Sequence, residues 1–144
     1  MRSRRVGEGE ARYLLVFDKG DEVVGSLLEF AHQEQLTAAS FTAIGAFSDV
    51  TLGFFERERK DYKRIPLEEQ VEVLTLAGDI ALKDGEPQVH AHAVVGKADG
   101  SAWGGHLLEA HVWPTLELVL VESPDEFRRV IDEETGLPLI TVGE

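Results

Sequence analysis

The stretch PQVHAHAVVGKADGSAWGGHLLE, residues 87–109, decides the fold because two β-rich segments flank a single turn. The turn is KADG at residues 97–100, and Asp-Gly is a common dipeptide in tight hairpins. Residues 87–96 and 101–109 are therefore predicted to be neighbouring antiparallel strands. His90 and His92 belong to the first strand and His106 to the second, so this hairpin could bring three imidazoles together.

Further strands are predicted on both sides of the hairpin, because aromatic and β-branched residues recur there with stretches of period two. They are ARYLLVFD (11–18), ASFTAIGAFSDVTLGFFE (39–56), VEVLTLAGDIALKDG (71–85) and PTLELVLVE (114–122). Helical spacing of apolar residues predicts one main helix over about 21–35, with Asp21 as its N-cap. The C-terminal SPDEFRRVIDEETG offers a helix start or a turn at Ser-Pro-Asp and a left-handed turn at Gly136. The predicted class is α/β of the α+β type: a largely antiparallel sheet with one main helix and few short helices.

Length and composition favour one domain over residues 1–144, with no disulfide framework and no thiolate ligand because the chain lacks cysteine. Any metal must be held by His, Asp or Glu. The net charge is -13, and residues 65–144 carry 16 acidic against 4 basic residues, so contact with nucleic acid is not the expected use of this surface. With no long apolar run, no membrane contact and a cytoplasmic location are expected.

The register of the hairpin decides whether the three histidines can meet. His90 and His92 share a face because side chains alternate along a strand. A two-residue turn would pair residue 93 with His106 and place His106 on the opposite face from His92. A three-residue loop, residues 98–100, would pair His92 with His106, and a bulge at Gly104 and Gly105 could also restore the alignment. A metal site therefore requires an odd loop or a bulge here.

Three neutral imidazoles suit Zn²⁺ or another borderline divalent ion and leave a fourth position for water, a carboxylate or a ligand. The alternative is that His90 and His92 line a half-buried face, each bonded to a backbone carbonyl or to water, with no metal. Both interpretations are compatible with the spacing.

Other side chains near this segment carry weaker signals. Glu117 and Glu109 are candidate general bases, or candidate carboxylates that orient the histidines through a hydrogen bond, although most single carboxylates on strands are solvated. Gly104 and Gly105 are more typical of a bulge than of a close approach by a ligand or a neighbouring chain. Trp103 is expected in the core or at a subunit interface. His111 is expected at the surface or an interface.

The run from His90 to His106, with IGAFSDVTLGFFE, VEVLTLAGDIAL and PTLELVLVE, resembles the PPC domain, also called DUF296, of prokaryotes and plant AT-hook proteins. The resemblance implies a compact α/β domain on an antiparallel sheet, a homotrimer and a metal, usually zinc. The family's H-x-H falls on His90 and His92, its G-G-H ends on His106, and Glu117 matches its acidic position. The plant proteins contact DNA through an Arg-Gly-Arg core, which RSRRVG at residues 2–7 lacks.

Three functions follow as expectations. The first is a non-catalytic, metal-binding trimer that binds a small ligand or a protein partner. The second is a zinc hydrolase in which Glu117 or Glu109 moves the proton of a metal-activated water. The third, and the least favoured, is a nucleic-acid-binding protein that uses the five basic residues Arg57, Arg59, Lys60, Lys63 and Arg64.

Overall fold

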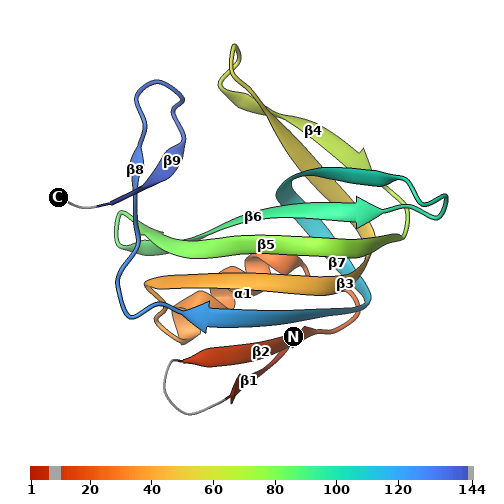
Figure 1. Cartoon of the computed structure of the whole chain (residues 1–144), viewed down its shortest axis with the longest axis horizontal. Coiled ribbons are helices and arrows are strands. Elements are labelled where there is room, and N and C mark those ends of the chain that lie inside the picture. The colour runs from red at the N-terminus through yellow and green to blue at the C-terminus, as the bar shows by residue number, and fades with distance from the viewer. Residues whose placement is uncertain (7–10, 143–144) are drawn as a thin grey trace.

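The computed structural model describes residues 1–6 and 11–142, and within them nine strands form one sheet beside one helix (Figure 1). In chain order the elements are β1 (Arg2–Val6), β2 (Arg12–Phe17), α1 (Val23–Gln33), β3 (Ala38–Glu56), β4 (Asp61–Leu67), β5 (Val71–Lys83), β6 (Glu86–Gly96), β7 (Ala102–Glu122), β8 (Arg128–Ile131) and β9 (Pro138–Thr141). The predicted class, a strand-rich α+β fold with one main helix, is confirmed.

The sheet follows the order β1-β2-β7-β3-β5-β8-β9, with β4 paired to β3 and β6 paired to both β5 and β7. Because β3 also pairs with both β5 and β7, these four strands form a closed circuit of pairings. Every pairing is antiparallel except a single parallel pair, Leu82 with Arg128, which makes the sheet mixed. The circuit fixes β6 against the first residues of β7, where the histidines lie.

The core lies between α1 and one face of the sheet. Alternate residues of the central strands enter it, for example Leu15 and Phe17 of β2 and Leu116 and Leu118 of β7, and all four are fully buried. The intervening residues point to the opposite face, where Val119 is exposed. Apolar burial on one face therefore fixes which side chains of β6 and β7 point away from the core, and the histidines are among them.

The helix starts close to the predicted position but with a different cap. Glu22 has extended backbone angles, and its carboxylate accepts hydrogen bonds from the backbone nitrogens of Val24 at 3.1 Å and Gly25 at 2.6 Å. Asp21, the predicted N-cap, instead forms an ion pair with the amino group of Met1 at 2.6 Å. The prediction of Asp21 was wrong because the helix begins one residue later, where Glu22 has the extended cap conformation and accepts from Val24 and Gly25.

The expected short helices are absent from the described part of the C-terminal segment, which forms the β8–β9 hairpin. The Ser-Pro-Asp sequence makes a turn, in which Ser123 Oγ accepts a hydrogen bond from the backbone nitrogen of Asp125. Gly136 has φ +75°, the predicted left-handed conformation, and its nitrogen donates to the Asp132 carbonyl at 2.7 Å. Among the described residues no helix is long and apolar enough to cross a membrane.

Candidate metal centre

The hairpin between β6 and β7 has the odd loop that the three-histidine site requires. The backbone nitrogen of Lys97 donates to the Ser101 carbonyl at 2.8 Å, which closes a three-residue loop over residues 98–100. Gly100 ends this loop with φ +82°. The resulting register pairs His92 directly with His106. The predicted parity is therefore confirmed.

The alternative prediction of a bulge at Gly104 and Gly105 is wrong for this pairing, which continues through both residues without a register shift. Gly105 instead serves a close approach: a Cβ atom there would lie 2.6 Å from the Gly53 carbonyl oxygen of β3. A Cβ on Gly104 would meet only ordinary contacts, the nearest at 3.4 Å. A register shift does occur in the pairing of β7 with β3, between residues 107 and 109 of β7.

The imidazoles of His90, His92 and His106 form one cluster, called the triad below. The ring centroids are 5.0, 5.2 and 5.5 Å apart, and the Nε2 atoms of His90 and His92 are 3.2 Å apart. One ring nitrogen from each residue lies within 4.8 Å of the other two. Three nitrogens at these separations could hold one divalent ion.

Burial and neighbouring groups disfavour the charged form of two rings of the triad, those of His90 and His106. Burial, together with the neighbouring His90 and His92, lowers the pKa of His106 to about 4. Burial and the nearby Arg129 guanidinium also lower the pKa of His90. The Nδ1 atom of His106 is buried and has no hydrogen-bond partner among the described residues. A metal binds the unprotonated imidazole, so the lowered pKa values of His90 and His106 and the unpartnered Nδ1 of His106 fit a bound ion.

Three further residues support the triad. Tyr62 of β4 stacks on His106 with ring centroids 4.6 Å apart and an interplanar angle of 26°. Asp79 of β5 lies directly opposite His90 and places a carboxylate oxygen 4.0 Å from its Nδ1. Arg129 of β8 forms an ion pair with the other oxygen of Asp79. Arg129 of the C-terminal hairpin thus holds the Asp79 carboxylate, and Asp79 in turn lies beside the ring of His90. A carboxylate in this position orients a histidine that binds a metal.

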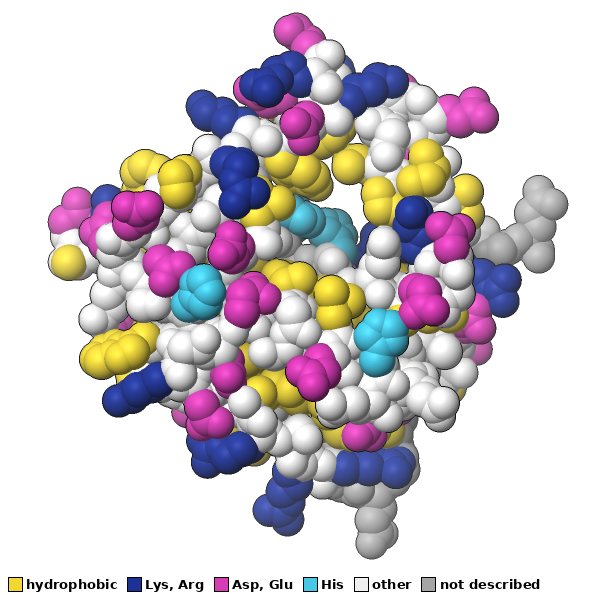
Figure 2. Space-filling model, turned by 180° about the vertical axis from the view of Figure 1, so that it is seen from behind, with side chains coloured by type: hydrophobic (Ala, Val, Ile, Leu, Met, Phe, Trp, Pro, Cys, Tyr) yellow, Lys and Arg dark blue, Asp and Glu magenta, His cyan; other side chains and the backbone are white. Residues whose placement is uncertain are grey.

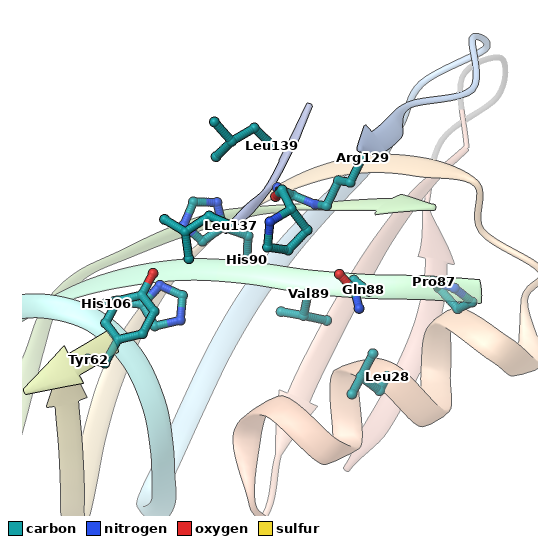
Figure 3. Close-up of a pocket in the computed structure, with 11 residues that line it drawn as sticks. Leu28, Tyr62, Pro87, Gln88, Val89, His90, His106, Arg129, Leu137 and Leu139 are labelled. Atoms are coloured by element: carbon teal, nitrogen blue, oxygen red, sulfur yellow. The ribbon is translucent and has the colours of Figure 1, made fainter. Parts of the chain in front are cut away.

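A cavity of about 380 Å³ opens beside the triad. Figure 2 shows histidine side chains inside a hollow with hydrophobic side chains around it. Figure 3 shows how its lining converges from separate elements: His90 and Val89 come from β6, Leu28 from α1, and Leu137 and Leu139 from the β8–β9 hairpin. Volumes in this range hold small organic molecules.

The other predicted site residues lie apart from the triad. Glu117 pairs with Val16 and Ile44 and lines a separate depression. Glu109 is 3.7 Å from Arg64, and neither glutamate belongs to the cluster of ring nitrogens.

The Nδ1 of His111 donates a 2.7 Å hydrogen bond to the Asp49 carboxylate at the surface, which was one of the two predicted placements. Trp103 is 41 % exposed, with Lys97 Nζ 5.2 Å from its ring centroid, so its expected placement in the core is wrong for the isolated chain. The alternative placement at a subunit interface stays a prediction.

The sequence matches the model of the Plants and Prokaryotes Conserved (PCC) domain over residues 4–124. The chain therefore belongs to this family, which is also called the plant- and prokaryote-conserved (PPC) domain family. It is also 36% identical over 120 residues to a Synechococcus protein described as the bifunctional protein GlmU. That match covers 81% of this chain and 18% of the Synechococcus protein, so the chain spans under a fifth of that relative's length.

Solved structures of the same family superimpose closely on this chain. A plant- and prokaryote-conserved protein from Pyrococcus horikoshii is 34% identical, with 92% of each chain covered and a TM-score of 0.86. A protein from Archaeoglobus fulgidus described as metal-containing is 34% identical, with 99% and 100% coverage and a TM-score of 0.85. A protein from Ralstonia eutropha, provisionally described as DNA-binding, is 31% identical, with 98% and 96% coverage and a TM-score of 0.89.

Proposed function

We propose that this PPC-domain protein is a homotrimeric, non-catalytic module that holds a divalent metal, preferentially Zn²⁺, through His90, His92 and His106 and binds a small ligand or a protein partner beside it. The observation that carries the proposal is the convergence of three ring nitrogens within 4.8 Å of one another. The proposed functional unit is the single domain of residues 1–144, acting in the cytoplasm.

The chemistry of the triad supports zinc and a binding role. Three neutral imidazoles leave at least one open position on a tetrahedral ion, which a ligand can occupy. The carboxylate nearest to His90 belongs to Asp79, and its ion pair with Arg129 favours an orienting role over that of a free base. Glu117 and Glu109, the bases that a hydrolase would need, lie elsewhere, so the arrangement supports binding better than hydrolysis.

The exposed apolar side chains of the sheet support self-association. Leu14 and Val119 pair directly on the face that points away from α1, and Ile44 is exposed on the neighbouring strand. An open sheet face is ordinarily polar, so apolar side chains there favour contact with another protein surface. A homotrimer would cover them, and light scattering at several protein concentrations would measure its mass directly.

DNA binding is the alternative favoured by the description of the Ralstonia relative. The basic residues of residues 57–64 are partly neutralised, because Arg59 pairs with Glu56 at 3.1 Å and Arg64 lies 3.7 Å from Glu109. With a net charge of -13, the chain as a whole repels phosphate. Anisotropy of a labelled duplex would decide: affinity that falls about a thousandfold between about 50 and 200 mM salt would favour DNA.

The metal proposal is tested by thermal unfolding of the chelator-stripped protein. Zinc at a hundred times its dissociation constant should stabilise the folded state by about 2.7 kcal/mol, because only the folded chain brings the triad together. His92→Ala should remove this shift, whereas His111→Ala, a histidine outside the triad, should retain it. Equal shifts in both variants would contradict the proposed site.

A further inference from the structure

The cavity beside the triad differs in charge from the rest of the surface. The chain has 27 acidic residues and a net charge of -13. Among the described residues that line the cavity, none is Asp or Glu and one, Arg129, is a cation. Figure 2 shows acidic side chains spread over the same face outside the hollow. The lining therefore offers an anion one cation and no carboxylate, although the Arg129 guanidinium is itself paired with Asp79, which lies outside the lining.

Arg129 is held in place and retains unused hydrogen-bond donors. Its side chain is 95 % buried, with Nη1 donating to the Pro138 carbonyl at 3.0 Å and Nη2 to Asp79. A guanidinium has five N–H donors, and the buried Nε of Arg129 has no partner among the described residues. Figure 3 shows the side chain reaching into the same space as His90. Arg129 lines the cavity, and its two Nη atoms carry more N–H groups than Pro138 and Asp79 accept from, so the guanidinium can donate to a carboxylate or another planar oxyanion.

The remaining walls define the rest of the ligand. Val89 and Leu28 contribute apolar surface from the body of the protein, and Leu137 and Leu139 contribute it from the β8–β9 hairpin. Tyr62 closes the end beside His106. A volume of about 380 Å³ lies near the lower limit for small-molecule sites, so it fits a short apolar chain better than a large ring system.

We infer that the cavity binds a small monocarboxylate with a short apolar chain, whose carboxylate lies between the ion of the triad and Arg129. The inference rests on the proposed function. Imidazoles bind a divalent ion as neutral ligands, so three of them leave its two positive charges without an anionic ligand. The apolar chain then packs against Val89, Leu137 and Leu139, which supply affinity but no charge.

The test uses zinc-loaded full-length protein and two probes of similar shape, butyrate and its uncharged analogue butyramide, compared by titration calorimetry. Butyrate should bind at least about tenfold more tightly, since only it carries the charge. Leu139→Asp places a carboxylate in the lining and should reject butyrate. Ile140→Asp is the matched control, because Ile140 is the next residue of β9, equally exposed at 42 % against 43 %, and does not line the cavity. Arg129→Gln should weaken butyrate but not butyramide.

Zinc content measured on each sample separates the inference from the proposed function. Bound zinc with equal affinity for butyrate and butyramide overturns the inference and leaves the metal site standing. Equal losses in Leu139→Asp and Ile140→Asp also overturn it, because the cavity would then not be the binding place. Protein that takes up no zinc overturns both. Selective binding of butyrate, lost only in the cavity variants while zinc content is unchanged, supports the inference.

Discussion

Gly105, next to His106, has no room for a side chain, and replacing it tests the packing of β3 against β7. A Cβ atom there would lie 2.6 Å from the Gly53 carbonyl oxygen, whereas real Cβ atoms essentially never come within 3.0 Å. The two strands must then separate by at least about 0.4 Å. Overpacking of this kind costs about 1–3 kcal/mol. Gly105→Ala should lower the free energy of unfolding by that amount and displace the adjacent His106.

The neighbouring Gly104 is the matched control. A Cβ there meets only ordinary contacts at 3.4 and 3.5 Å, so Gly104→Ala should be neutral or stabilise by about 0.4–1 kcal/mol through the unfolded chain. Urea unfolding at one protein concentration should separate the two variants by about 1–4 kcal/mol, or about 3–12 °C in Tm for a chain of this length. Variants that differ by less than about 0.5 kcal/mol would refute the close approach of β3.

Two smaller predictions concern the helix cap and a surface ion pair. Glu22→Ala should lower the free energy of unfolding by about 1 kcal/mol, because it removes the acceptor for the backbone nitrogens of Val24 and Gly25. The control Glu29→Ala, on the exposed side of α1, should lower it little. Equal effects of the two variants in urea unfolding would argue against the cap. The hydrogen bond to Asp49 raises the pKa of His111 above 6.5, so the pair stabilises the fold below pH 6.5 and this stabilisation is lost as pH rises through the higher pKa. Burial opposes the effect, but the same bond helps to lower the pKa of Asp49 below 3.8. The free energy of unfolding of wild type should therefore exceed that of His111→Asn most between pH 3.8 and 6.5. A difference that widens above pH 6.5 would contradict this.

Local rules were sufficient to predict the hairpin and its histidines. Alternation placed His90 and His92 on one face, and the Asp-Gly turn left a choice between two registers, of which the odd loop brings His106 opposite His92. The two glycines were misinterpreted because the feature that requires Gly105 is the Gly53 carbonyl of β3, which is remote in sequence. The sequence pattern of β7 does not indicate that β3 is its neighbour on the side opposite β6.

The surroundings of the triad were missed for the same reason. Asp79 and Arg129 are 50 residues apart, and only the pairing of β5 with β6 and the folding back of β8 bring them to His90. Tyr62 lies in the basic run of residues 57–64, which was considered only for contact with nucleic acid or as a solvated surface. Arg129 lay in a segment for which a helix start was considered. Alternation from the buried Val71 and Val73 would place Asp79 on the inner face, but the β-bulge between Val73 and Thr75 reverses it, so the sequence pattern does not locate Asp79.

The most direct test of the metal centre is the metal content of protein purified after zinc-replete growth and extensive dialysis, measured by mass spectrometry of the elements. Convergence of His90, His92 and His106 predicts about one ion per chain in wild type and in His111→Ala, and loss of the ion in folded His92→Ala. Wild-type protein without stoichiometric metal, or His92→Ala that retains a full ion, would contradict the account.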